Sequence, residues 1–167
     1  MAKLSETLTR DRPPQKVLIG TRLSRAQLDA LLAAHARFRA GRIDGRRAVL
    51  LRCDLSGLDL KGIDLSGADL VDCDFEGSNL TGARFDGATL TGSRFADSLL
   101  NATRFAGADL SRADFHMADL RGADLSEAKL AEARLETALI GESPESGLPT
   151  TLDTRVLDRV MERRRRH

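Results

Sequence analysis

The sequence predicts an all-β solenoid built from short repeats, and the evidence is a regular pattern in the middle of the chain. A large apolar residue occupies every fifth position from Leu50 to Ile140 without exception. A period of five matches neither the 3.6-residue period of a helix nor the two-residue period of a strand. An unbroken fixed period of this kind indicates a repeat architecture.

The period divides residues 48–142 into 19 units of five residues. Each unit has in order a small or medium residue, a residue that is usually polar, a large apolar residue, a variable residue and often a glycine. The pattern is clearest in Ala108-Asp109-Leu110, Ala113-Asp114-Phe115, Ala118-Asp119-Leu120-Arg121-Gly122 and Ala123-Asp124-Leu125. This run of units resembles the pentapeptide-repeat protein family, and the resemblance covers more than half of the chain.

The resemblance implies a right-handed, quadrilateral parallel β-helix in which four consecutive units form one coil. The 19 units then make nearly five coils. The large residue and the small residue two positions before it are expected to point inward, and the other three positions outward. Glycine at the fifth position suits corners that need a positive φ.

A coil of four units identifies which inward side chains stack on one another. Cys53 and Cys73 are four units apart, so we expect two buried thiols in adjacent coils; no third ligand accompanies them, and we predict no metal site. The predicted structural core contains two phenylalanine stacks and a leucine ladder, namely Phe75, Phe95 and Phe115, Phe85 and Phe105, and Leu60, Leu80, Leu100 and Leu120.

Residues 1–47 are predicted to form an N-terminal arm and a capping helix. A leader occupies residues 1–16, and residues 17–19 are either a short strand or an apolar anchor. Ser24 and Gln27 form a capping box before a helix at about residues 25–40, which Gly41 ends. This helix is expected to cover the open end of the solenoid, because terminal repeats need a cap. Its apolar stripe consists of Leu28, Leu31, Leu32, His35 and Phe38, with His35 as a packing residue.

Residues 143–167 are predicted to form a linker followed by a helix at about residues 152–164 and a basic tail. The apolar stripe of this helix indicates either a cap on the last coil or a homodimer interface, and the resemblance supports both, since some family members dimerise through C-terminal caps. The candidate residues are Leu152, Val156, Leu157, Val160 and Met161.

The outward positions carry any function, and four residues stand out as a candidate partner surface. Arg84 and Arg104 are neighbours on one ladder, an unfavourable pair unless something binds there. Leu99 interrupts a polar ladder and Met117 replaces a corner glycine, and exposed apolar residues of this kind mark interfaces. For Leu139, on the same ladder as Leu99, the alternatives are an exposed position and cover by the C-terminal segment.

Two further outward residues, Arg94 and His116, are not expected to bind a partner or to act in catalysis. Arg94 lies between Asp74 and Asp114 on its ladder, which we interpret as charge compensation. His116 has no nucleophile or second base beside it, so we assign it no catalytic role.

Composition and charge narrow the classes of function. The chain has 167 residues and a net charge of +1, with local balances of +7 in residues 1–49, −8 in residues 50–142 and +2 in residues 143–167. No apolar run has the length of a membrane span, and the N-terminus lacks the apolar segment of a signal peptide, so we expect a cytoplasmic protein. The chain has no catalytic triad, phosphate loop or metal-ligand spacing, so we predict neither an enzyme nor a cofactor.

The first functional hypothesis is a non-catalytic scaffold that presents its β-helix faces to a protein partner of unknown identity. The resemblance implies an alternative, because some pentapeptide-repeat proteins mimic duplex DNA, bind DNA gyrase and protect it from inhibitors. The −8 balance favours that alternative, whereas the basic ends and the interleaved arginines count against it. Direct nucleic-acid binding ranks last, because the N-terminal charges are scattered and lack interleaved aromatic residues.

Overall fold

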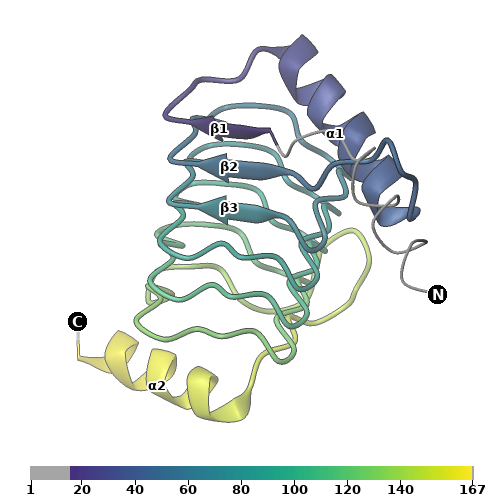
Figure 1. Cartoon of the computed structure of the whole chain (residues 1–167). Helices are drawn as coiled ribbons and strands as arrows, with labels where there is room; N and C mark the ends of the chain where they lie inside the picture. The colour runs from purple at the N-terminus through teal and green to yellow at the C-terminus, as the bar shows by residue number, and fades with distance from the viewer. Residues whose placement is uncertain (1–15, 167) are drawn as a thin grey trace, which may run out of the picture.

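The computed structural model describes residues 16–166, in which the repeat forms a stack of coils joined by parallel pairing (Figure 1). Bridges join the outward residue of one coil to the equivalent residue four units later, from Asp54 with Asp74 through Asp119 with Leu139. Backbone hydrogen bonds also join successive coils, and the Arg94 N–H donates to the Cys73 carbonyl at 2.9 Å. The predicted leader, residues 1–16, lies outside the described residues except for Lys16.

Five regular elements accompany these bridges. Three strands form a parallel sheet in the order β1-β2-β3, with Leu18, Leu50 and Leu70 in register. The elements are β1 (Val17–Ile19), α1 (Arg25–Arg39), β2 (Val49–Leu51), β3 (Asp69–Val71) and α2 (Thr154–Arg165). No helix among residues 16–166 combines the length and the apolar character needed to cross a membrane.

The parallel pairing extends past the five-residue pattern at both ends. Val17 pairs with Val49, whereas the position four units before Val49 lies within α1, so α1 and its connections are an insertion into the first coil. Asp124 bridges to Thr151, which lies beyond the position four units later. The predicted linker after residue 142 is therefore an excursion that rejoins the solenoid, which the repeat pattern alone does not reveal.

Phenylalanine side chains fill the centre of the stack in two columns. All five repeat phenylalanines are fully buried, as are Leu60, Leu80, Leu100 and Leu120. The rings of Phe75 and Phe95 are nearly parallel with centroids 5.0 Å apart, and the Phe85–Phe105 spacing is 5.4 Å. The two columns meet edge to face at 5.7 to 6.4 Å. Both geometries are favourable for aromatic pairs, so the rings join each coil to its neighbours.

The fifth residue of each unit from Arg52 to Glu132 has a left-handed backbone conformation. Glycine adopts it freely, but Met117 also adopts it, with φ of 56°. At several corners a carboxylate or amide oxygen accepts a hydrogen bond from the N–H two residues later, as Asp54 does from Ser56 at 2.9 Å. Such side chains stabilise turns. The residues that make this contact are Asp54, Asp59, Asp64, Asp74, Asn79, Asp109, Asp114, Asp119 and Asp124.

The two cysteines occupy successive coils and both are buried with free thiols. The Cys53 thiol donates to the Leu18 carbonyl at 3.3 Å, and the Cys73 thiol to the Leu50 carbonyl at 3.4 Å. Burial raises the pKa of the Cys73 thiol to about 12. That thiol is therefore protonated at neutral pH and unreactive as a nucleophile.

Helix α1 has the predicted capping box, with Ser24 and Gln27 each bonded to the other's backbone N–H. The helix ends at Arg39, and Gly41 follows its C-cap with a positive φ of 69°. Its contacts reach residues 64–66, so α1 lies along the side of the first coils as well as at the open end (Figure 1).

His35 joins α1 to the solenoid with both ring nitrogens. The Ala48 N–H donates to Nδ1 at 3.1 Å, so Nε2 carries the proton and donates to the Ser66 carbonyl at 3.1 Å. The side chain is fully buried. Burial lowers the pKa of His35 below its ordinary value of 6.5, against an opposing effect of Asp64; Arg39 and Arg47 also favour the neutral form.

Helix α2 packs beneath the last coil (Figure 1). Asp153 caps it, so the helix begins at Thr154, two residues later than predicted, and Leu152 precedes it. Val160 is buried and Val156 packs against the core, whereas Met161 is 45% exposed. Arg164 donates to the carbonyls of Leu135, Glu136 and Ala138. The Ala138 carbonyl is at the position that in the preceding coil, at Ala118, accepts from the next coil.

Truncating the central aromatic ring tests this core. Phe95→Ala is expected to lower the free energy of unfolding by about 3–5 kcal/mol, because it removes stacking on both sides and leaves a cavity. The exposed Leu99→Ala is the matched control and is expected to cost roughly 1 kcal/mol or less. Chemical denaturation measures both, and equal effects would contradict the packing described here.

The His35 contacts predict a pH dependence. Because the folded-state pKa of His35 is lowered, its contribution to stability is fully present above the unfolded pKa of about 6.5 and is lost as pH falls. His35→Gln is expected to be less stable at pH 7.5 and to change less between pH 7.5 and 5.5. Parallel stability curves for wild type and His35→Gln would refute this role.

Candidate interaction surface

One outward ladder carries exposed apolar side chains among polar neighbours. Bridges order it as Asp59, Asn79, Leu99, Asp119 and Leu139. The two leucines are 48% and 51% exposed, and Met117, at the corner before Asp119, is 54% exposed. The alternative that the C-terminal segment covers Leu139 is wrong. That segment rejoins the stack at Thr151 beside Asp124, on a different ladder, and Leu139 stays exposed. We call Leu99, Met117 and Leu139 the Leu99 surface.

Asp119, between the two leucines, contributes little accessible charge. Its side chain is only 11% exposed, and Arg121 donates to both carboxylate oxygens at 2.8 and 2.6 Å. The hydrogen bond from Arg121 is the main cause that holds the pKa of Asp119 below its ordinary value. A partner that covers the leucines therefore meets a carboxylate already neutralised within the chain.

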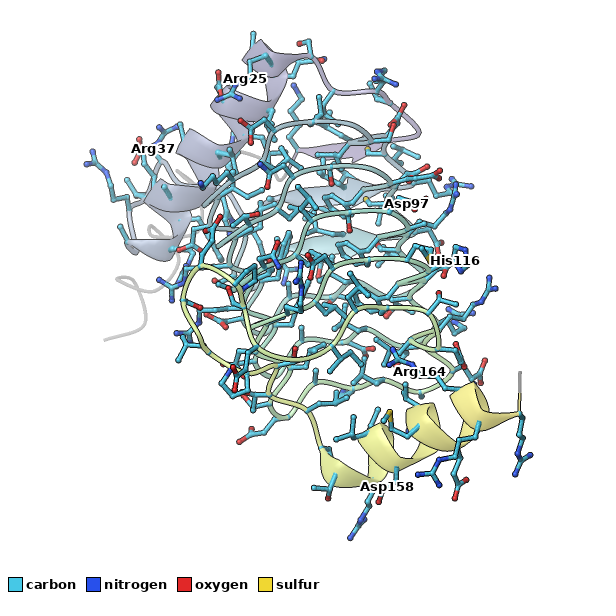
Figure 2. The ribbon with its side chains drawn as sticks, turned by 180° about the vertical axis from the view of Figure 1, so that it is seen from behind. Arg25, Arg37, Asp97, His116, Asp158 and Arg164 are labelled. Carbon is cyan, nitrogen blue, oxygen red and sulfur yellow. The ribbon has the colours of Figure 1, made fainter. Side chains whose placement is uncertain are left out.

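The edge beside Met117 is polar and continues toward α2. Figure 2 shows Asp97 and His116 one after the other along this edge, with Arg164 of α2 beyond them. The Thr137 hydroxyl lies 2.9 Å from His116 Nδ1 and accepts from the Met117 N–H at 3.1 Å. These contacts give the apolar surface a polar rim, as interfaces ordinarily have.

The interpretation of Arg84 and Arg104 as a pair that requires an external ligand is wrong. The two residues do bridge as neighbours. However, the Asp86 carboxylate accepts from Arg84 at 3.3 Å and from Arg104 at 3.2 Å. Asp86 follows Arg84 by two residues and belongs to a different outward position, which a reading of one ladder at a time overlooks. The chain itself supplies the anion between the two guanidinium groups.

The other arginine ladder is also compensated, with one of the two expected partners of Arg94 and one other. Arg94 pairs with Asp74 at 3.2 Å and with Glu76, whereas Asp114 pairs with Arg134 at 3.3 Å. Many repeat aspartates therefore serve two internal purposes, accepting from a turn N–H and pairing with a basic side chain. The negative balance of the repeat is consequently less accessible than the sequence count indicates.

Among residues 16–166, no cluster of three His, Cys, Asp or Glu side chains has an arrangement that would hold a metal ion. A broad cleft of about 640 Å³ lies between α2 and the last coils, but His116 within it contacts Thr137 rather than a carboxylate. Binding through a surface is the chemistry that this arrangement supports.

Several solved structures are similar to this chain. HetL, a protein involved in heterocyst differentiation regulation in Nostoc sp. strain PCC 7120, is 24% identical with a TM-score of 0.36. The match covers 62% of this chain and 58% of HetL, which is less than two thirds of HetL.

Two more of these structures extend the comparison. Alr5209 from Nostoc PCC 7120 is 26% identical over 82% of this chain and 100% of its own, with a TM-score of 0.31. QnrB1, a plasmid-mediated fluoroquinolone resistance protein, is 21% identical over 68% and 66%, with a TM-score of 0.29. No functionally curated protein matches this sequence.

Family models match the repeat directly. One, described as a pentapeptide repeat region, matches residues 46–124 and 68–144. A second, described as pentapeptide repeats in eight copies, matches residues 21–70, which include the segment before the regular pattern. With more than half of its length matched, this chain belongs to the pentapeptide repeat family.

Proposed function

We propose that this protein is a non-catalytic scaffold that binds a protein partner through the Leu99 surface. The observation that carries the proposal is the exposure of Leu99, Met117 and Leu139 on coils whose other outward residues are mostly polar or paired. Covering each half-exposed leucine contributes roughly 1 kcal/mol. Met117 adds an adaptable side chain of the kind that binding surfaces favour.

The proposed shape of the scaffold is a quadrilateral solenoid of nearly five coils. Bridges that recur at intervals of four units support four units per coil. Such a shape presents long, straight ladders, and the Leu99 surface extends along one of them over three successive coils. A cytoplasmic location stays a prediction from the sequence.

The alternative is a DNA mimic that binds DNA gyrase. The −8 balance of residues 50–142 favours it. The geometry favours it less, because a mimic needs accessible negative charge, and Asp74, Asp86 and Asp114 are each paired with arginine. Arginines at outward positions also interrupt the acidic ladders. We therefore place the scaffold first.

Charge substitutions on the ladder test the scaffold. Affinity capture from the source cells, read by quantitative mass spectrometry, is expected to lose its main protein partner with the double variant Leu99→Lys, Leu139→Lys. Thr89→Lys, on a different ladder, is the control and should retain that partner. Identical captured proteins from both variants would count against the Leu99 surface. Inhibition or protection of gyrase supercoiling by the wild-type chain at micromolar concentration would favour the mimic instead.

We further propose that α2 acts as a cap on the last coil and does not form a dimer interface. The burial of Val160 and the Arg164 contacts to the last carbonyls support the cap. The dimer alternative depends on Leu157 and on Met161, at the exposed edge of the helix.

Two substitutions on α2 separate these alternatives. Val160→Asp is expected to lower the unfolding midpoint, because it buries an unpaired charge. Met161→Lys should change neither the midpoint nor the molar mass. Denaturation and light scattering measure the two effects. A wild-type mass of two chains that Met161→Lys halves would establish the dimer and overturn the cap-only proposal.

A further inference from the structure

A cavity lies at the N-terminal end of the molecule, between β1, α1 and the chain that enters β2. Its volume is about 360 Å³, at the lower end of the range for small-molecule sites. Ala26 and Ala30, one helical turn apart, leave room for it on α1. The apolar lining consists of Leu18, Ala26, Ala30, Leu31 and Ala48.

Basic side chains line the same cavity, and one of them has no carboxylate partner among residues 16–166. Lys16, Arg46 and Arg47 all contribute to the lining, and Arg47 pairs with Asp69. Arg46 makes no ion pair with any carboxylate of residues 16–166, and its Nε–H is buried without an acceptor there. Leaving such a donor unsatisfied is costly.

The neighbouring arginines differ from Arg46 in having a carboxylate partner, although the Arg37 Nε–H is also buried without a hydrogen-bond acceptor of suitable geometry among residues 16–166. Arg37 pairs with Asp44 at 3.0 Å, and Arg42 pairs with the same carboxylate at 3.3 Å. Arg39 pairs with Asp64. Residues 16–166 therefore pair these neighbouring arginines and leave the Arg46 guanidinium, beside the apolar cavity, without a carboxylate partner.

We propose that this cavity binds a small organic carboxylate with an unbranched apolar chain. The carboxylate accepts charge-assisted hydrogen bonds from Arg46, which satisfies the buried Nε–H. The apolar chain lies against Ala26, Ala30 and Leu31. A bound ligand contacts β1, α1 and the entry to β2 together, and so adds contacts between the inserted helix and the first coils. This site is separate from the Leu99 surface and does not depend on the function proposed for it.

Isothermal titration of the full chain with decanoate tests the proposal. Saturable binding is expected below about 1 mM. Arg46→Met keeps an unbranched side chain but removes its charge and donors, and it should weaken binding at least tenfold. Arg42→Met, which removes a nearby arginine outside the cavity, is the matched control and should bind as wild type does.

Two further measurements separate the charge from the apolar walls. Decan-1-ol, which has the same chain without the carboxylate, is expected to bind at least tenfold more weakly than decanoate. Ala30→Phe fills the cavity and should abolish binding, while thermal unfolding checks that the variant remains folded. Equal affinity of wild type and Arg46→Met, equal binding of the alcohol, or no saturable decanoate binding would each overturn the proposal.

Discussion

The stacking of one large apolar side chain from each five-residue unit inside a narrow coil is the constraint on which the rest of the structure depends. Phe75, Phe95 and Phe115 repeat at intervals that match the parallel pairing of the backbone, so aromatic contact and backbone hydrogen bonding reinforce each other. Each coil buries its apolar layer only against its neighbours, and stability is therefore shared along the stack. The ends of the stack then need different chemistry.

At both ends of the stack, a segment outside the five-residue pattern is inserted and the chain then resumes the parallel pairing between coils. At the first end, β1 supplies a rung before the regular pattern, and His35 holds the inserted helix against the coils. At the second end, Thr151 resumes the parallel pairing before α2, and Arg164 donates hydrogen bonds to backbone carbonyls of the last coil. Both ends thus satisfy backbone groups that a repeat leaves open, since buried polar groups need partners.

Most charged side chains of the repeat pair with other groups of the same chain. The Leu99 surface differs from its surroundings because its side chains are apolar and exposed. Aspartate carboxylates accept hydrogen bonds from the N–H groups at the corners, and they pair with arginines on the same or an adjacent outward position. Where the acid is replaced by leucine, at residues 99 and 139, neither use is available and an apolar side chain is left exposed. Arg46 is a second exception, a cation placed beside apolar walls. These two departures from the general pattern are the places where binding is proposed.

The sequence by itself determined the solenoid, the inward residues and both helices, because a period of five and two helical stripes are local patterns. It also identified Leu99 and Met117 as departures from the pattern. The tertiary structure alone decided what lies beside what. Asp86 neutralises Arg84 and Arg104 because residues of different outward positions meet across coils, and β1 joins β2 although the whole of α1 lies between them in the chain. Those contacts depend on how the coils stack in space, and the five-residue period alone does not encode them.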